Sequence, residues 1–168
     1  MNGILIIDKP QDFTSFDVVA VMRRLCSQKK IGHTGTLDPM ATGVLPLLLG
    51  NAARAQAILP DSDKEYDASF QLGVTTDTLD STGRVLTRTE NVSVTRETLC
   101  RALGPFRGEI MQIPPMYSAV SKDGKRLYEL ARKGIEVERE KRPVTISELT
   151  LLSYNEETAC GRLHIACS

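Results

Sequence analysis

The residues best suited to chemistry lie in one stretch of twelve, residues 32–43, which reads GHTGTLDPMATG. It contains His33, one of only two histidines in the chain, and a single carboxylate, Asp38. Pro39 fixes its own φ and biases Asp38 toward an extended backbone. Glycines in the stretch allow the backbone to approach a ligand closely. A carboxylate held in this way can act as a nucleophile or as a general base.

Two structural interpretations compete with the catalytic one. Asp38 could cap a helix whose first residue is Pro39, because Asp followed by Pro is common at helix starts. The glycines could instead form an anion-binding loop, but the stretch lacks the Lys-Ser/Thr ending of a P-loop. Residue types alone therefore leave the helix cap and the catalytic carboxylate open.

Residues 32–43, followed by the apolar run 44–50, closely resemble the signature of the TruB family of tRNA pseudouridine synthases. Other segments that resemble this family follow in the right order: GILIIDKP at 3–10, TS at 14–15, KEY at 64–66, LG at 72–73, TDTLDSTG at 76–83, IPPMYSA at 113–119 and RLYELARKG at 126–134. The resemblance covers nearly the whole chain. The sequence is more similar to the stand-alone bacterial members of the family than to the guide-dependent ones. It implies an isomerase that converts the T-loop uridine of tRNA (position 55) to pseudouridine.

The resemblance also implies an α+β fold, with a mixed, mainly antiparallel sheet and packed helices, incomplete at its C-terminus. Residues 1–168 would be the amino-terminal part of the catalytic domain, with an RNA-binding thumb insertion at about 117–141. The rest of that domain, the arginine that pairs with the family's aspartate, and a PUA domain would be absent. We therefore expect the β-type stretches 143–152 and 162–168 to lack pairing partners and to leave exposed edges.

In this family the aspartate of the motif is the catalytic residue, and it falls on Asp38. It either adds to the sugar at C1′ or removes the C2′ proton, and the sequence does not choose between these roles. The target uridine must be flipped out of the T loop, and His33 matches the residue that helps to hold the flipped state. Tyr66 would stack on the extruded base, a contact worth about 1–3 kcal/mol. The other substrate-binding residues expected here are Thr36, Leu37 and Lys9.

These residues also have structural interpretations. Tyr66 can be a core aromatic at the start of a strand, since aromatic residues are common there, and His33 can be a turn residue. The basic run between 122 and 142 usually marks a solvated helix face, although the family's thumb lies against the RNA loop. That run alone would suffice for a non-catalytic RNA-binding or tRNA-folding module, with Asp38 as a cap.

The composition fits one globular domain, with 168 residues, 41% hydrophobic content and a formal net charge of +0. Such a charge argues against an indiscriminate polyanion binder, so binding of the tRNA T arm would need local basic patches. No apolar run is long enough to span a bilayer, and no secretory signal is visible. We expect a cytoplasmic protein, a monomer when complete, with no membrane partner. The four cysteines lack CxxC spacing and should be free thiols, with no metal or cofactor.

Local patterns predict the elements that position these residues. β-type patterns fall at 4–7, 66–72, 84–89, 106–112, 143–146, 149–151 and 162–167. Helical patterns fall at 16 to about 27 with Ser15 as N-cap, at 41–49, at 51–59, and up to 103 with Thr95 as cap. The segment 75–83 should be a turn in which Asp77 and Asp80 are caps rather than metal ligands. The end of the first helix carries four basic residues, which either interact favourably with its C-terminal dipole or contact phosphate. They are Arg23, Arg24, Lys29 and Lys30.

Overall fold

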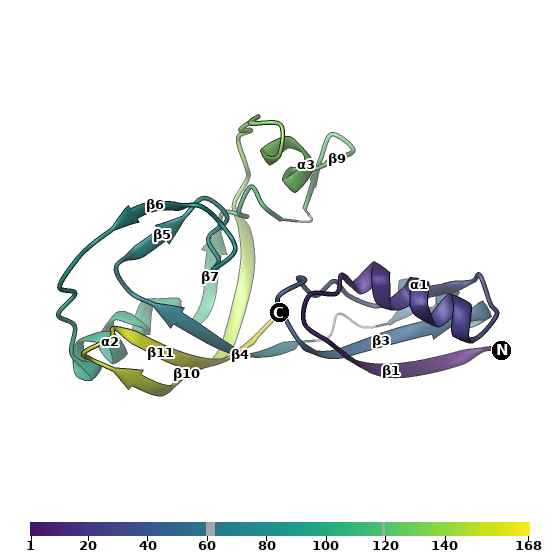
Figure 1. The fold of residues 1–168 in the computed structure, drawn as a ribbon, viewed down its shortest axis with the longest axis horizontal. Coiled ribbons are helices and arrows are strands. Elements are labelled where there is room, and N and C mark those ends of the chain that lie inside the picture. The colour runs from purple at the N-terminus through teal and green to yellow at the C-terminus, as the bar shows by residue number, and fades with distance from the viewer. Residues whose placement is uncertain (60–62, 119) are drawn as a thin grey trace. The chain divides into compact units, whose positions relative to one another are not determined.

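The computed structural model describes residues 1–59, 63–118 and 120–168. The chain divides into two compact units, Met1–Asp61 and Ser62–Ser168, which are described separately here as unit 1 and unit 2 (Figure 1). Over the described part of the chain, no helix combines the length and apolar character that crossing a membrane requires.

Unit 1 is a small antiparallel sheet covered on one face by a helix. Its elements are β1 (Gly3–Lys9), α1 (Ser15–Leu25), β2 (Ile31–His33), β3 (Gly43–Leu49) and the 3-10 helix η1 (Gly50–Ile58). The strand order is β1-β3-β2, and Figure 1 shows α1 lying along this sheet. Val18 and Val19 of α1 pack with Leu45 and Leu47 of β3 in a core from which solvent is almost excluded.

The helix predicted at 41–49 is wrong, because residues 43–49 form the central strand β3 and residues 41–42 belong to the loop before it. A short, fully apolar run does not reveal its period, so a buried strand and a buried helix look alike in sequence. Pro46 is tolerated because it lies beyond the β2 ladder, where its carbonyl accepts a hydrogen bond from Thr34 N–H at 3.1 Å. The helical pattern at 51–59 is confirmed, although as a 3-10 helix.

The first helix is confirmed, but its cap is Thr14 rather than Ser15. Thr14 Oγ1 accepts a hydrogen bond from Asp17 N–H at 3.0 Å, and the Asp17 carboxylate accepts one from Thr14 N–H at 2.9 Å. This reciprocal capping box satisfies two backbone donors at the helix start. The Thr14 hydroxyl also donates to Asp17 Oδ2 at 2.6 Å, and this bond, together with the one from Thr14 N–H, holds the pKa of Asp17 below its ordinary value. Ser15 is thereby left available for another contact.

Unit 2 contains most of the β structure. Its elements are β4 (Lys64–Gln71), β5 (Val74–Thr76), β6 (Val85–Arg88), α2 (Arg96–Ala102), the 3-10 helix η2 (Gly104–Phe106), β7 (Gly108–Gln112), β8 (Ser121–Lys122), β9 (Lys125–Arg126), α3 (Leu127–Ala131), β10 (Arg142–Asn155) and β11 (Cys160–Cys167). The main sheet has the order β4-β11-β10-β7, and β5-β6 and β8-β9 form two-stranded sheets. The helix capped by Thr95 is confirmed.

Each strand pairing found among the described residues is antiparallel, and the α+β class is confirmed. The prediction that 143–152 and 162–168 lack partners is wrong. These stretches belong to β10 and β11, which pair with each other, while β7 and β4 pair with their outer sides. β10 and β11 form a hairpin, and the earlier strands β7 and β4 complete the sheet at its two edges.

The turn before β6 confirms the structural roles of its two aspartates. Asp77 Oδ1 accepts a hydrogen bond from Arg84 N–H at 2.8 Å. Asp80 Oδ1 accepts bonds from the backbone N–H and the hydroxyl of Thr82 at 2.8 and 2.6 Å. Although partial burial opposes the shift, hydrogen bonds from Thr82 and Thr78 hold the pKa of Asp80 below its ordinary value. Within the described ranges, no group of three or more His, Cys, Asp or Glu side chains could hold a metal.

Candidate active site

Asp38 lies in the loop that joins β2 to β3, and its side chain is exposed. No helix begins at Pro39, since the residues up to β3 form a turn closed by Ala41 N–H donating to Asp38 O at 3.0 Å. The interpretation of Asp38 as a helix cap is therefore wrong. Among the described residues, no hydrogen bond or ion pair occupies the Asp38 carboxylate. The carboxylate is thus available to a ligand.

The loop is held firmly although its carboxylate is exposed. Leu37, the residue before Asp38, bonds through its N–H to Ser15 Oγ at 2.9 Å and packs partly against the core of unit 1. Pro39, the residue after it, accepts a hydrogen bond from Asp12 N–H at 2.8 Å. Asp38 therefore stands between two fixed neighbours, which restricts the directions its side chain can take.

Lys9 is the most unusual side chain of this region because it is completely buried. Its Nζ donates to the carbonyls of Pro10, Phe13 and Pro39 at 3.0, 2.6 and 3.2 Å. A buried ammonium is tolerated only when its hydrogens are satisfied, and here three carbonyls supply that need. Lys9 was predicted to bind substrate, but its geometry suits a role in holding the Pro39 end of the Asp38 loop.

His33 ends β2 and is half-buried at the start of the loop. Its Nδ1 lies 2.6 Å from the carbonyl oxygen of Gly35, so Nδ1 carries the hydrogen in that contact. In the neutral ring this leaves Nε2 as an acceptor. Thr36 is exposed on the same loop. His33, Thr36 and Leu37 thus lie on the segment of unit 1 that carries Asp38, and Lys9 bonds to its Pro39 carbonyl.

Tyr66 lies in unit 2, on β4, where it pairs with Ile165 of β11. Its side chain is 38% exposed, which leaves part of the ring accessible to a ligand. The alternation predicted for this strand is confirmed, since Ala68 and Phe70 on the same face are more buried than the residues between them. The combined use of Tyr66 and Asp38 in one site is a proposal made below.

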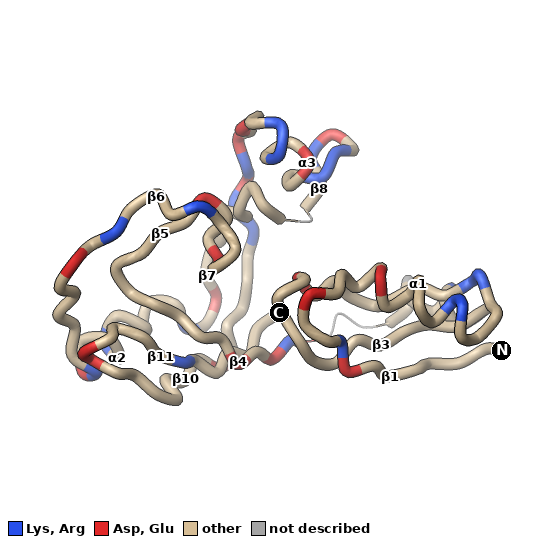
Figure 2. The backbone as a smooth tube through the Cα atoms, in the orientation of Figure 1, with Lys and Arg blue, Asp and Glu red and all other residues tan. Residues whose placement is uncertain are grey.

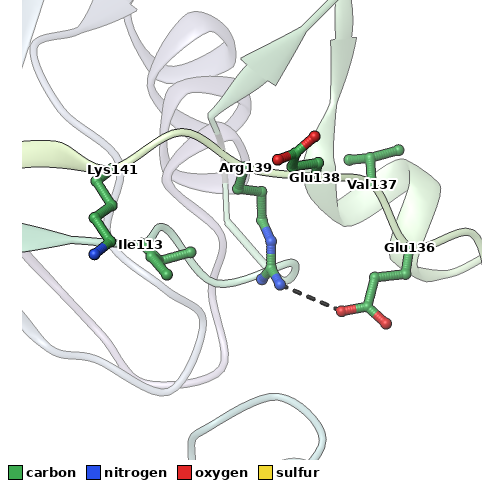
Figure 3. A pocket seen from close by; sticks show the side chains of 6 residues that line it. All are labelled: Ile113, Glu136, Val137, Glu138, Arg139 and Lys141. Carbon is green, nitrogen blue, oxygen red and sulfur yellow. Dashed lines mark hydrogen bonds and ion pairs between the residues drawn. The ribbon is translucent and has the colours of Figure 1, made fainter.

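The thumb segment, residues 117–141, contains β8, β9 and α3, and Figure 1 shows it projecting beyond β7 and β10. A cavity of ≈ 550 Å³ lies at its base (Figure 3) and is lined by Ile113, Glu136, Val137, Glu138, Arg139 and Lys141. Arg139 bridges its walls, with Nη2 3.3 Å from Glu136 Oε1 and Nη1 donating to Pro114 O at 3.1 Å. Acidic and basic side chains both line this cavity, and the contacts of Arg139 connect the thumb segment to Pro114.

One polar cluster of unit 2 was not anticipated from the sequence. Asp67 Oδ1 lies 3.0 Å from His164 Nδ1, and Asp67 Oδ2 lies 3.1 Å from Arg162 Nη2. The hydrogen bond with Asp67 raises the pKa of His164, against a smaller opposing effect of burial, and Glu148 and Glu65 add to the rise. These residues meet only through the register of β4, β11 and β10, so their separation in the chain hid them. They lie on the face of β4 opposite to Tyr66.

Comparison with known proteins now decides the family. The model of the TruB family pseudouridylate synthase N-terminal domain matches residues 23–168. This chain belongs to that family. The match to the family contains the Asp38 loop, Tyr66 and the thumb segment.

TruB relatives named tRNA pseudouridine synthase B support the same assignment. The relative from Azoarcus sp. (strain BH72) is 54% identical over 157 residues, covering 94% of this chain and 52% of its own length. The relative from Stutzerimonas stutzeri (strain A1501) is 51% identical over 168 residues, covering 100% of this chain and 54% of its own length. The chain therefore spans about half the length of the curated relatives it matches.

Solved structures show that the TruB chain shares its fold with part of two longer chains. A crystal structure of a Cbf5-Nop10-Gar1 complex matches with a TM-score of 0.69 and 26% identity, over 98% of this chain and 39% of the other. A structure of an H/ACA RNP bound to a substrate RNA containing 2′-deoxyuridine matches with a TM-score of 0.65 and 23% identity, over 98% of this chain and 37% of the other. The second match supports the fold alone.

Proposed function

We propose that this chain is the amino-terminal part of a tRNA pseudouridine synthase that acts on the T-loop uridine at position 55. The observation that carries the proposal is the Asp38 loop, in which an exposed carboxylate stands between two residues held by other parts of unit 1. The names of the relatives support the reaction class. The same proposal makes the protein cytoplasmic and monomeric when complete, with tRNA as its partner.

Asp38 serves as the reacting carboxylate. In the ionised form it adds to C1′ of the flipped uridine or removes the C2′ proton, and either step releases the base by breaking the N1–C1′ bond. The base turns and C5 bonds to C1′. In the first route the bond between C1′ and Asp38 breaks in this step, and in the second Asp38 returns the proton to C2′. C5 then loses its proton and N1 takes one up, so the product has the same atoms as uridine. The reaction is an isomerisation, so neither step consumes an oxidant or a reductant. The exposed loop position suits Asp38 because the ribose must approach it from outside unit 1.

The other proposed residues prepare the substrate. Tyr66 stacks on the extruded base, and its 38% exposure leaves ring surface for that contact. His33 helps to hold the opened T loop, with Nε2 free to accept a hydrogen bond because Nδ1 faces Gly35 O. Thr36 and Leu37 contact the nucleotide beside Asp38, while Lys9 acts through the loop that it holds.

The thumb segment is proposed to lie against the RNA. Its basic residues are Lys122, Lys125, Arg126, Arg132, Lys133, Arg139 and Lys141, and Arg142 follows at the start of β10. Lys122 donates to Glu138 O, and Arg139 donates to Pro114 O. These contacts shape the segment, and its exposed cations (Figure 2) are suited to phosphate contacts.

The test uses a chimaera in which residues 1–168 replace the matching half of the Stutzerimonas stutzeri relative. The chimaera is incubated with an unmodified tRNA transcript, and pseudouridine is located by digestion and mass spectrometry. We expect pseudouridine at position 55 and at no other uridine. A chimaera that binds the transcript but forms no pseudouridine would instead indicate a non-catalytic tRNA-binding or folding module.

A further inference from the structure

Asp38 is held on both sides, and the two sides are held differently. On the Pro39 side, two donors from separate residues share one carbonyl. On the Leu37 side, which also packs partly against the core, both hydrogen bonds involve one hydroxyl: Ser15 Oγ accepts a hydrogen bond from Leu37 N–H at 2.9 Å and donates one to Leu37 O at 3.3 Å. A single side chain thus fixes both polar groups of the residue that precedes the proposed catalytic carboxylate.

The helix does not explain the identity of Ser15. It is the first residue of α1, but the capping bonds are made by Thr14 and Asp17. Alanine would serve the helix at least as well, because it has the higher helix propensity. Ser15 is only 2% exposed, and a buried hydroxyl requires hydrogen-bond partners. Its partners lie 22 residues away in sequence, on the Asp38 loop.

We propose that Ser15 is a positioning residue for Asp38, an inference that rests on the proposed function of that carboxylate. By clamping Leu37 to the start of α1, the hydroxyl fixes the backbone from which the Asp38 side chain departs. Substrate then meets a carboxylate whose direction is set before binding. Misplacement of a reacting group by about 1 Å can lower a rate by about 100-fold, so a small loop movement is sufficient to matter.

The experiment replaces Ser15 by alanine in the chimaera and compares it with Thr14→Ala. We expect kcat at saturating tRNA to fall roughly 10- to 100-fold for Ser15→Ala, with Kd for tRNA changed by no more than about twofold. Thr14→Ala disturbs the same helix terminus without touching Leu37, so its kcat should remain within about twofold of the parent. Amide hydrogen exchange should show faster exchange at Leu37 in Ser15→Ala only, because that N–H loses its acceptor.

A second pair of variants separates the hydroxyl from side-chain size. Ser15→Thr keeps a hydroxyl and Ser15→Val has the same shape without one, so any cost of the added methyl group is common to both. We expect the Thr variant to exceed the Val variant in kcat by roughly tenfold. Equal kcat values for this pair, or equal losses in Ser15→Ala and Thr14→Ala, would overturn the positioning role. A parent chimaera without activity would instead refute the proposed function, so the two failures are distinguishable.

Discussion

Replacement of Lys9 by methionine should loosen the Asp38 loop while leaving the volume of the site nearly unchanged. Lys9 Nζ donates to three carbonyls. After the substitution, the Pro39 carbonyl still accepts a hydrogen bond from Asp12 N–H, but no other donor to the Pro10 and Phe13 carbonyls is shown among the described residues of unit 1. Each carbonyl that loses its partner costs about 1–3 kcal/mol, while methionine avoids the desolvation of a buried charge. We expect a net loss of about 2–4 kcal/mol in the free energy of opening the loop.

The assay is amide hydrogen exchange on residues 1–168, read at Asp12 N–H, whose acceptor is Pro39 O. A loss of about 2–4 kcal/mol corresponds to exchange roughly 30- to 700-fold faster, since each 1.4 kcal/mol is a factor of ten. Lys30→Met is the matched control, because Lys30 is exposed and its Nζ lies 3.4 Å from Asn51 Oδ1. A surface change of this kind stays within about 0.5 kcal/mol. Equal exchange in the two variants would refute the role assigned to Lys9.

Two further predictions concern unit 2. His164→Gln should destabilise residues 1–168 more at pH 5.5 than at pH 8.5. The folded pKa of His164 is raised from 6.5, so its contribution is complete below about that pH and is lost as pH rises through the folded value; equal shifts of the urea midpoint at both pH values would contradict this. Gly161→Ala should lower stability by about 1–3 kcal/mol, because a Cβ there would lie 2.6 Å from Phe70 Cζ and 2.7 Å from Ser153 O. Gly104→Ala is the control, because a Cβ at that position would have nothing within 4 Å. Equal changes in Tm for the two variants would show that the sheet accommodates the added methyl group without cost.

The sequence predicts well where a local signal and a tertiary need agree. Alternating residues gave β4 correctly, and the composition of 75–83 gave its turn. The prediction failed at 41–49, where a mostly apolar run shows no alternation of polar and apolar residues, so a strand could not be told from a helix. It also failed for β10 and β11, whose partners β7 and β4 precede them by tens of residues, a separation that no local pattern encodes.

The site shows the same division between local and long-range information. Asp38 could be singled out because its motif is contiguous. The contacts that hold it could not be predicted. Lys9 is expected from the sequence to bind substrate and Ser15 to cap a helix, but they act on Pro39 and Leu37 across 30 and 22 residues of sequence. Thr14 and Ser15 are both favoured N-caps by residue type, and only the fold shows that Thr14 caps α1 while Ser15 reaches the loop.

The most direct test of the central claim is the single-turnover rate of pseudouridine formation by the Asp38→Asn chimaera at saturating tRNA. Asparagine keeps the shape of the side chain but removes the charge and basicity that the reaction requires. Release of tritium from C5-labelled uridine follows the rate, and filter binding follows tRNA affinity. We predict no detectable release with affinity nearly unchanged, while Asp63→Asn, at an exposed carboxylate of unit 2, keeps the parent rate. Turnover by Asp38→Asn at the parent rate would contradict the assignment of Asp38 as the catalytic carboxylate.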